Sequence, residues 1–513
     1  MKIQNSRTKN VSINAMVGIV FQIIQIAGAF ISRTFFIKLL GAEYLGVNGL
    51  FTNILTILSF AELGIGNAFA FRLYKPLAEN NRKELSSLMG FYKKVYNCIG
   101  AIIAVAGLCV VPFLDVIIKE KPNIVENLTA IYVLFLFNTV ISYFVSFKRS
   151  LIDADQKGWI KTILQETMAI IQIIAQILIL YFTHNYILYL IVMITSTLIY
   201  NLISSIVANK IYPFLREKSP PIDKEVSKSI FKDVGAFAVY RFGNVITNGT
   251  DNIIISSMIG VGSVGLVSNY TLLSSYANLI LSKIVSAFTA SIGNLKAHCD
   301  DIAKLKSVFQ KLLWITAWLY GLVAVGFVVI ANIFIECWLG EGYILSPITV
   351  LAMGIDFYVR GMLYTAETYR SVFGYFREGK YSALAGAILN IVLSILLCLW
   401  IGLPGIFIAT PISRLLTIGL LDPILIYKKT FHQNPAEYFL HYFGHAILIL
   451  LIGLICYYFC SLISVNAWLS VILMVVIVLS VFNSLMLLCF CRTKMLKELF
   501  KALWGILPLK KKK

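Results

Sequence analysis

Four arginines lie within long apolar stretches of this sequence: Arg33, Arg241, Arg360 and Arg414. The planar guanidinium group donates paired hydrogen bonds, which suits the oxygen atoms of a phosphate. A charge at the centre of a bilayer costs roughly 2.5 to 3.5 kcal/mol on insertion scales, so such residues should face protein or water instead of lipid. The arginines therefore predict a site for an anionic ligand inside a membrane protein.

Other polar side chains accompany these arginines on the same helix faces, counted at about 100° per residue. The three stripes are Gln22, Gln25 and Arg33; Arg241, Asn244, Asn248, Asp251 and Asn252; and Asp356, Arg360, Glu367 and Arg370. One interpretation is the lining of a polar cavity; the other is mutual pairing that fixes helix packing, as for Asp356 and Arg360. Glu62 and Asp251 could neutralise the arginines or take a coupling cation, and both readings stay open.

The composition places these stripes in a bilayer. Hydrophobic residues make up 59% of the chain and charged residues 13%, with a mean hydropathy of +0.83. At about 20 residues per crossing, the apolar blocks predict an all-α integral membrane protein with about fourteen transmembrane helices. They are expected near residues 11–40, 47–74, 95–114, 128–147, 160–182, 186–208, 234–258, 264–292, 308–335, 346–369, 381–400, 406–427, 440–461 and 467–490.

The net charge of +19 would suggest nucleic acid as a partner of a soluble protein, but the basic residues lie on alternate loops. The intervening turns near His184, Gly262, Gly342, Pro404 and Val465 contain no lysine or arginine. This is the positive-inside pattern of a multi-pass membrane protein. It predicts that both termini are cytoplasmic, and it removes the need for a nucleic-acid partner.

An internal repeat relates the two halves of the chain. The pairs separated by 219 positions are Gly41 and Gly260, Gly46 and Gly265, Gln22 and Arg241, Gln25 and Asn244, and Arg33 and Asn252. The glycines are expected in short turns between apolar segments. Six helices separate equivalent points, so the halves should run in the same direction, related by an axis along the membrane normal.

The repeat gives a domain plan. An N-terminal lobe of six helices is expected over 1–208 and a C-terminal lobe of six helices over 234–430. The segment 209–233 is dense in charge and contains Pro220 and Pro221, so it should be a cytoplasmic linker. Two further helices over 431–491 have no counterpart, and 492–513 forms a basic cytoplasmic tail.

Several motifs are set aside. His441 and His445 stand one helical turn apart, but no third ligand is evident, so no metal site is expected. The glycines at 260, 262 and 265 match GxGxxG without a preceding strand, and no GxxxxGK[ST] motif occurs. The sequence therefore predicts no cofactor, no nucleotide and no enzymatic activity.

The runs LLGAEYLGVNGLF and AELGIGNAFAFRLYKPLAE resemble the start of the Wzx-type oligosaccharide flippases, the polysaccharide transporter branch of the MOP superfamily. The resemblance is most specific over residues 1–100. It implies two six-helix lobes that open alternately to each side of a bacterial cytoplasmic membrane. It also implies a lipid-linked oligosaccharide as substrate, moved from the inner to the outer leaflet, with the arginines around its pyrophosphate. The bilayer is the other partner, and polysaccharide polymerase machinery is a further candidate.

Two other functions remain open. A MATE-like cation-coupled exporter of small molecules would need unbalanced acidic residues in its cavity, and here arginines and carboxylates are about equal in number. A membrane polysaccharide polymerase or ligase usually needs a long outer loop bearing arginine or histidine. The longest outer loop expected here, 115–127, is short.

Overall fold

The computed structural model describes residues 2–59, 65–230, 249–298, 301–375, 382–463 and 466–491. The regular elements in these ranges are helices, and they contain no strand. The chain separates into two compact units, Met1–Ser268 and Asn269–Lys513. The all-α fold is therefore confirmed, whereas the lobe and linker boundaries drawn from the sequence stay a prediction.

The first unit contains eight long or medium helices among its described residues. They are α1 (Lys2–Leu40), α2 (Ala42–Leu58), α3 (Ile65–Ala78), α4 (Arg82–Val110), α6 (Leu128–Tyr143), α7 (Ser146–Ala154), α8 (Gly158–Thr183) and α9 (Tyr186–Ile211). Asparagine caps fix three helix starts, because the side chains of Asn81, Asn127 and Asn185 accept hydrogen bonds from backbone N–H groups three residues on. These caps explain why α4, α6 and α9 begin where they do.

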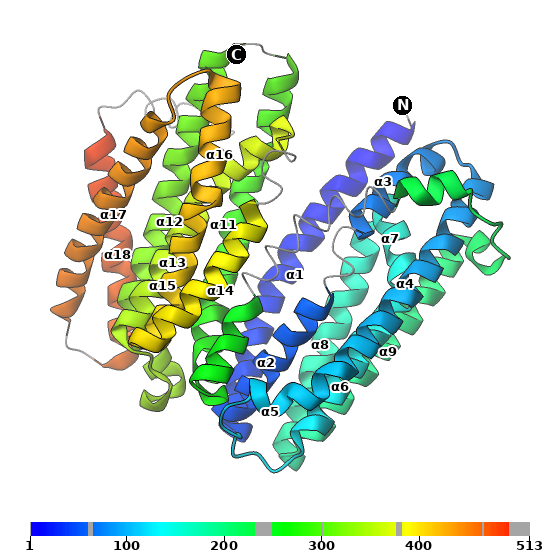
Figure 1. Ribbon diagram of the computed structural model, residues 1–513, viewed down its shortest axis with the longest axis horizontal. Coiled ribbons are helices and arrows are strands. Elements are labelled where there is room, and N and C mark those ends of the chain that lie inside the picture. Colours follow the sequence, from blue (N-terminus) through cyan, green and yellow to red (C-terminus); the bar gives the residue numbers. More distant parts are fainter. Residues whose placement is uncertain are drawn as a thin grey trace, which may run out of the picture. The chain divides into compact units, whose positions relative to one another are not determined.

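Within the first unit, α1 packs along α8, α8 along α9, and α4 and α6 continue the layer (Figure 1). Aromatic side chains fill its interior. Phe69 of α3 stacks on Tyr92 of α4 with ring centroids 3.5 Å apart, and Tyr132 of α6 donates a 3.0 Å hydrogen bond to the carbonyl of Gly107. Buried tyrosines thus carry both the packing and the polar ties between helices.

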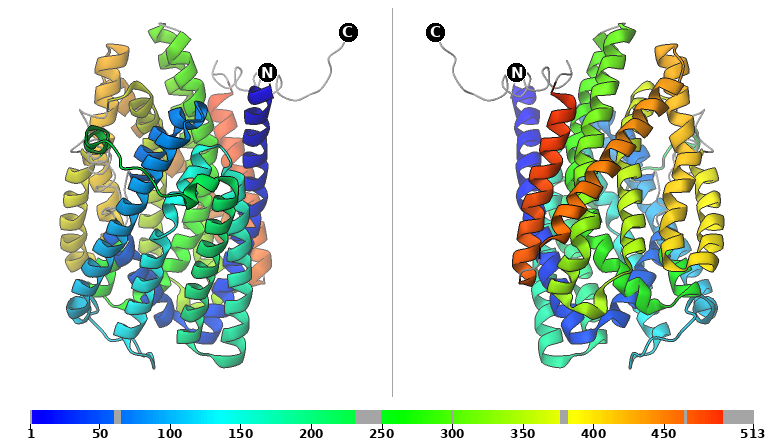
Figure 2. Two further views of the ribbon diagram at one scale, coloured as in Figure 1. Left: turned by 90° about the vertical axis from the view of Figure 1, so that its right-hand side faces the viewer. Right: turned by 90° about the vertical axis from the view of Figure 1, so that its left-hand side faces the viewer.

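The second unit is built from the long helices that follow. They are α11 (Val261–His298, of which residues 269 onward belong here), α12 (Ile302–Leu339), α13 (Pro347–Phe373), α14 (Ser382–Ile401), α15 (Leu403–Leu416), α16 (Ile418–Ile426), α17 (Ala436–Ser461) and α18 (Ala467–Phe490). Helix α12 packs against α13, α17 and α18, and α15 packs against α13 and α14. The last two helices lie side by side (Figure 2).

A glycine fixes the close approach of α12 and α13. A Cβ atom at Gly361 would overlap the ring and Cβ of the fully buried Tyr320. We expect Gly361→Ala to lower the free energy of unfolding by about 1–3 kcal/mol, the usual cost of overpacking. Gly326→Ala, on α12, is the matched control, because its Cβ would meet only Val478, at 3.8 Å. Thermal unfolding of the two purified variants measures the difference, and equal midpoints would contradict this account.

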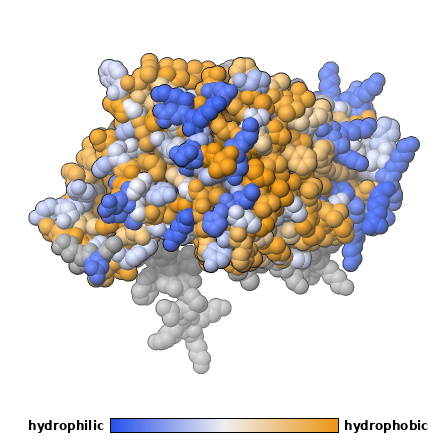
Figure 3. Space-filling view, turned by 90° about the horizontal axis from the view of Figure 1, so that it is seen from below, coloured by the Kyte–Doolittle hydropathy of each residue, from blue (hydrophilic) through white to orange (hydrophobic). Residues whose placement is uncertain are grey.

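The described residues include nine helices that are long and apolar enough to cross a membrane, or ten if the bent pair α6 and α7 forms one span. Many large apolar side chains on these helices are exposed, such as Ile174, Leu399 and Leu450. Figure 3, which views the molecule from below, shows hydrophobic and hydrophilic side chains together on that face. Several bounds match the sequence prediction closely: α18 runs from Ala467 to Phe490, as expected, and α8 covers the expected 160–182. The chain is a multi-pass membrane protein.

The two glycine pairs of the repeat require glycine for different structural reasons. Gly41 and Gly260 lie in turns with φ of 94° and 141°, which L-residues rarely adopt. The prediction that Gly46 and Gly265 lie in turns is wrong, because α2 already begins at Ala42 and α11 at Val261. These two glycines are helical, and they matter for packing.

Gly46 and Gly265 allow the starts of α2 and α11 to touch, inside the first unit. A Cβ atom at Gly46 would overlap the carbonyl oxygen of Val261, and one at Gly265 would overlap that of Ala42. Val261 stands 219 positions after Ala42, as Gly265 does after Gly46. The contact is therefore reciprocal, as expected where a two-fold axis relates two copies of a repeat.

Candidate functional site

The second unit brings three of the predicted site residues into contact. Asp356 and Arg360 lie one turn apart on α13, with Arg360 Nη2 3.7 Å from Asp356 Oδ2. Arg414 reaches across from α15, and its Nη1 donates to Asp356 Oδ1. One carboxylate thus serves two guanidinium groups, which leaves this trio with a net positive charge. The Arg360 side chain is 39% exposed, against 11% for Arg414.

A second charged group lies further along α13. Arg370 donates a 2.9 Å hydrogen bond from Nη1 to Oδ1 of Asp422 on α16, and both side chains are buried. Glu367 lies within electrostatic range of Asp422 and Arg370. Counted together, the cluster of three arginines and three carboxylates is formally neutral. Glu367 also interacts with Arg414 and Arg360, so it links the two charged groups, and Arg360 is the most exposed of the three arginines.

A break between two short helices positions Asp422. Helix α15 ends at Leu416 and α16 begins at Ile418, with Thr417 at φ −114° and ψ −90° between them. Pro423 follows Asp422 and lacks a backbone N–H, so α16 forgoes one helical hydrogen bond at that point. The Arg370 side chain contacts this irregular segment. A straight, wholly apolar helix at the same place would give it no hydrogen-bond acceptor.

The first unit holds the other predicted residues separately from these. Arg33 on α1 is half-buried and donates from Nη1 to Ser268 Oγ at 2.8 Å. Gln22 is half-buried, Gln25 is exposed, and Asp251 is half-buried within the helical residues 249–258. These residues therefore lie on α1 and on the helical segment before α11.

Four predicted site residues, Glu62, Arg241, Asn244 and Asn248, lie outside the described residues. Of the others, the structure joins Asp356 to Arg360 and Arg414, places Glu367 near them, and ties Arg33 to the α11 hairpin. The expected mutual pairing of Asp356 and Arg360 is present as a contact. What these residues bind stays a prediction.

Sequence reasoning missed the role of Asp422. Its signal was available, because a single aspartate within the apolar run LLDPIL needs a buried partner in a membrane helix. The identity of that partner depends on how α13 and α16 pack, which no local pattern records. Arg370 was predicted on the polar stripe of α13, with cavity lining and helix packing both left open, but Asp422 was not identified as its partner.

An apolar groove flanks the same helix that carries Arg414. It has a volume of about 260 Å³ between α15, α16 and α17. Its lining consists of Ile412, Leu415, Leu416, Gly419, Leu420, Tyr438, Phe439, Tyr442 and Phe443. Arg414 and Leu415 are adjacent in sequence, so α15 presents a charge toward α13 and hydrocarbon toward α17.

The fold defined by these helices is shared with solved membrane transporters. The lipid II flippase MurJ, in an inward closed conformation, is 15% identical, with a TM-score of 0.63 over 93% of this chain and 98% of that one. An inward-facing MATE multidrug transporter of the MOP superfamily is 12% identical, with a TM-score of 0.62 over 80% and 96%. A MATE transporter from Vibrio cholerae gives 15% identity and 0.55 over 84% and 100%. The chain thus has the all-helical MOP fold.

Residues 37–346 match the model of the family described as "Polysaccharide biosynthesis protein", and the chain belongs to this family. The resemblance predicted from the sequence is confirmed at this level. A comparison with curated proteins gave no match.

Proposed function

We propose that the protein translocates undecaprenyl-pyrophosphate-linked oligosaccharide from the inner to the outer leaflet of a bacterial cytoplasmic membrane by alternating access. Membership of a polysaccharide biosynthesis family and the fold of MurJ and MATE transporters support this. The observation that carries the proposal is the trio in which Arg360 and Arg414 share Asp356. Both termini would be cytoplasmic, as the basic loops predict.

The trio suits a pyrophosphate for an electrostatic reason. Asp356 offers one carboxylate oxygen to each arginine, Oδ1 to Arg414 and Oδ2 to Arg360, and so keeps both guanidinium groups beside each other. A pyrophosphate could accept hydrogen bonds from Arg360, whose side chain is 39% exposed. Charge-assisted, bidentate hydrogen bonds of this kind are among the strongest that a side chain makes.

The groove beside Arg414 supports the same substrate class. A lipid-linked oligosaccharide carries its anionic group between a sugar and a hydrocarbon chain. The charged trio and the apolar groove lie on the two sides of α15, so one helix could contact both chemical parts of the substrate.

A MATE-like cation-coupled exporter is the second candidate. The carboxylates Asp356, Glu367 and Asp422 are the groups that could hold a cation, although the three arginines of the cluster balance their charge. Such a protein would bind its cationic substrate at these carboxylates, and removal of an arginine would then leave transport intact or improve it. The two functions thus predict opposite effects of the same substitutions.

The test is leaflet sidedness of labelled undecaprenyl-pyrophosphate oligosaccharide in proteoliposomes. Arg360→Lys and Arg414→Lys keep the charge but lose the paired donors, and we expect each to reduce the rate of transfer about tenfold or more. Arg33→Lys tests the first unit in the same way. Arg82→Lys, on the exposed first turn of α4, is the matched control and should transfer at the unaltered rate.

Transfer that depends on the protein and falls in the Arg360 and Arg414 variants supports both the substrate and the site. If every variant transfers the substrate at the same rate, the protein is still a flippase, but these arginines serve helix packing and do not bind the substrate. Absence of transfer with every glycan, together with cation-driven efflux of small molecules, would establish the exporter instead.

A further inference from the structure

A pocket of about 370 Å³ lies within the first unit, at the ends of α4 and α9 that the basic loops place on the cytoplasmic side. Its lining residues come from α4, from the junction of α6 with α7, from α9, and from the segment that follows α9. Three lysines, Lys93, Lys148 and Lys218, line it together with a single carboxylate, Glu217. The pocket is thus positively charged, and it shares no residue with the arginine cluster.

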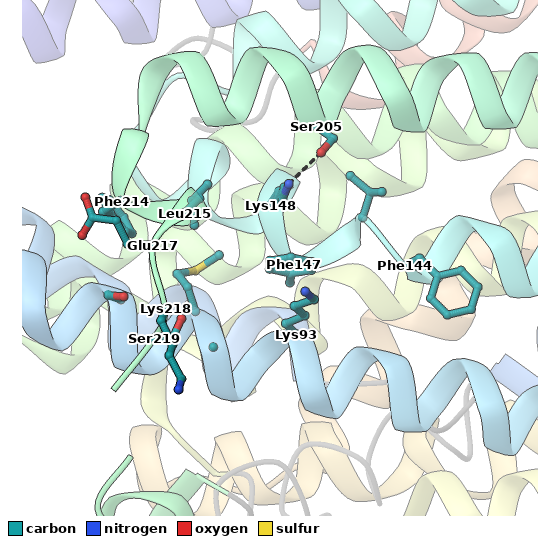
Figure 4. A pocket seen from close by; sticks show the side chains of 14 residues that line it. Lys93, Phe144, Phe147, Lys148, Ser205, Phe214, Leu215, Glu217, Lys218 and Ser219 are labelled. Atoms are coloured by element: carbon teal, nitrogen blue, oxygen red, sulfur yellow. Dashed lines mark hydrogen bonds between the residues drawn. The ribbon is translucent and has the colours of Figure 1, made fainter. Parts of the chain in front are cut away.

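Lys148 is held by neutral groups. The Lys148 ammonium donates to Ser205 Oγ at 2.6 Å and to Asn209 Oδ1 at 3.0 Å, which leaves its third N–H for another acceptor. Lys93 and Arg216 are close enough to repel the Lys148 charge. In Figure 4, Lys93 and Lys148 both lie near Phe147, whereas Glu217 lies at the far end of the pocket.

Among the residues that the structure describes, neither Lys93 nor Lys148 forms an ion pair with a carboxylate. Other lysines of the same unit do so readily, such as Lys157 with Asp155 at 2.7 Å and Lys161 with Asp153 at 2.5 Å. An anion bound between the two ammonium groups would offset the repulsion between them.

The segment after α9 folds over the pocket and closes one side of it. Ser219 packs on α4 where Gly90 leaves room, because a Cβ at Gly90 would overlap the Ser219 side chain. Ser87 Oγ donates to the carbonyl of Pro221 at 3.2 Å. The pocket therefore includes hydroxyl groups, from Ser86, Ser205 and Ser219, beside the lysines.

The start of this segment is fastened as well. Tyr212 donates a 2.6 Å hydrogen bond to Asp155 Oδ2, and η3 (Pro213–Arg216) follows directly. Burial, and then the hydrogen bond to Asp155, raise the pKa of Tyr212 well above its usual value, so the phenol remains a donor at neutral pH. The backbone that carries Glu217, Lys218 and Ser219 is thus anchored on both sides of the pocket.

We propose that this pocket binds a phosphate group, with Lys93 and Lys148 as its cationic ligands and Ser205 and Ser219 as hydroxyl ligands. Ammonium groups and hydroxyls are common ligands of phosphate oxygens. The volume of about 370 Å³ accommodates a phosphate with a small organic substituent. Bound there, the anion joins α4, α7 and α9 to the segment after α9, and so stabilises the docking of that segment.

The phosphate could belong to an anionic lipid headgroup or to a soluble phosphorylated molecule. The experiment separates the two sources. Purified full-length protein is compared in nanodiscs of phosphatidylglycerol and of phosphatidylcholine, and, in the latter, with inorganic phosphate and with glycerol 3-phosphate. The readouts are the thermal unfolding midpoint and the rate of tryptic cleavage after Arg216 and Lys218. Binding should raise the midpoint and slow the cleavage.

The variants are Lys93→Gln and Lys148→Gln, each expected to weaken the apparent affinity for the effective probe about fivefold to tenfold. Lys94→Gln is the matched control, since Lys94 is the next residue of α4, equally exposed and absent from the pocket lining. Lys93 is exposed and has no hydrogen bond in the described part of the chain, so its substitution should not unfold the protein. Gly90→Ala, which displaces Ser219, should weaken binding without removing a charge.

A response to phosphatidylglycerol alone assigns the pocket to a lipid headgroup, and a response to the soluble phosphates assigns it to a free ligand. The proposal is overturned if phosphatidylglycerol, inorganic phosphate and glycerol 3-phosphate all leave both readouts as they are in phosphatidylcholine alone, whose phosphate is neutralised by its own choline group. It is equally overturned if Lys93→Gln and Lys94→Gln respond alike, because the effect would then be general electrostatics. None of these outcomes depends on which substrate the protein transports.

Discussion

Replacing Asp422 with alanine should lower the free energy of unfolding by about 3–5 kcal/mol, the usual cost of leaving a buried charge without its partner. Arg370 is 2% exposed and Asp422 is fully buried, and their 2.9 Å contact joins α13 to α16. In Asp422→Ala the guanidinium would keep its charge in an apolar interior. Because the pair lies beside the break between α15 and α16, we also expect the position of Arg414 to be disturbed.

The measurement is thermal or denaturant unfolding of the purified protein, with Asp153→Ala as the control. Asp153 pairs with Lys161 at 2.5 Å, but both side chains are about a third exposed, and such pairs contribute at most about 1 kcal/mol. The double variant Arg370→Met with Asp422→Leu should regain most of the lost stability, since it removes both charges. If the single variant is as stable as the control, the pair is not buried as the structure shows.

Much of the fold could be predicted from the sequence because the physics of a bilayer is simple. Spans of about 20 apolar residues and alternate basic loops set the number, the order and the expected orientation of the helices. The bounds of α18 were predicted to the residue, and α17 begins at Ala436, four positions before the expected start. Such errors arise where a helix continues past the apolar core into its polar flank.

The candidate site was predictable only by residue type. Asp356, Arg360 and Arg414 were identified because a charge within an apolar helix needs a partner or access to water. The structure brings all three into contact. The pairing of Arg370 with Asp422 could not be predicted, since it depends on the break after Leu416. Polar stripes show which face of a helix is protected from lipid, but not which helix faces it.

The lysine pocket escaped sequence analysis for a related reason. Lys93 and Lys148 were counted as topological charges of the cytoplasmic loops, which is what most such residues are. They differ from their neighbours only through the serines and the segment after α9 that surround them. The three chain regions involved are separated by more than fifty residues each, so no local spacing reveals their meeting.

The glycines of the internal repeat show what the sequence could predict and what it could not. Equal spacing of glycines predicted a repeat, and Gly46 contacts Val261 in the same way as Gly265 contacts Ala42, each pair 219 positions from the other. The sequence could not show that one glycine pair serves backbone conformation and the other helix approach. Both demands select glycine, for independent reasons.

That distinction leads to the second large effect. Gly46→Ala and Gly265→Ala should each lower the free energy of unfolding by about 1–3 kcal/mol, because the new Cβ would overlap a backbone carbonyl that cannot rotate away. The contact is reciprocal, so the two losses should be nearly equal. Once either substitution has separated α2 from α11, the other Cβ meets less resistance. The double variant should therefore lose clearly less than the sum of the two.

Gly262→Ala is the control for this prediction, because Gly262 lies in the first turn of α11 and a Cβ there would meet nothing within 4 Å. Unfolding midpoints of the four variants test the packing, and leaflet transfer in proteoliposomes tests its use. Arg33 also donates a hydrogen bond to Ser268 beside this contact. Separation of the two helices should therefore displace Arg33, and we expect it to lower the rate of transfer as well as the stability. Losses that simply add, or that fall on Gly262→Ala equally, would show that the two glycines do not form one interface.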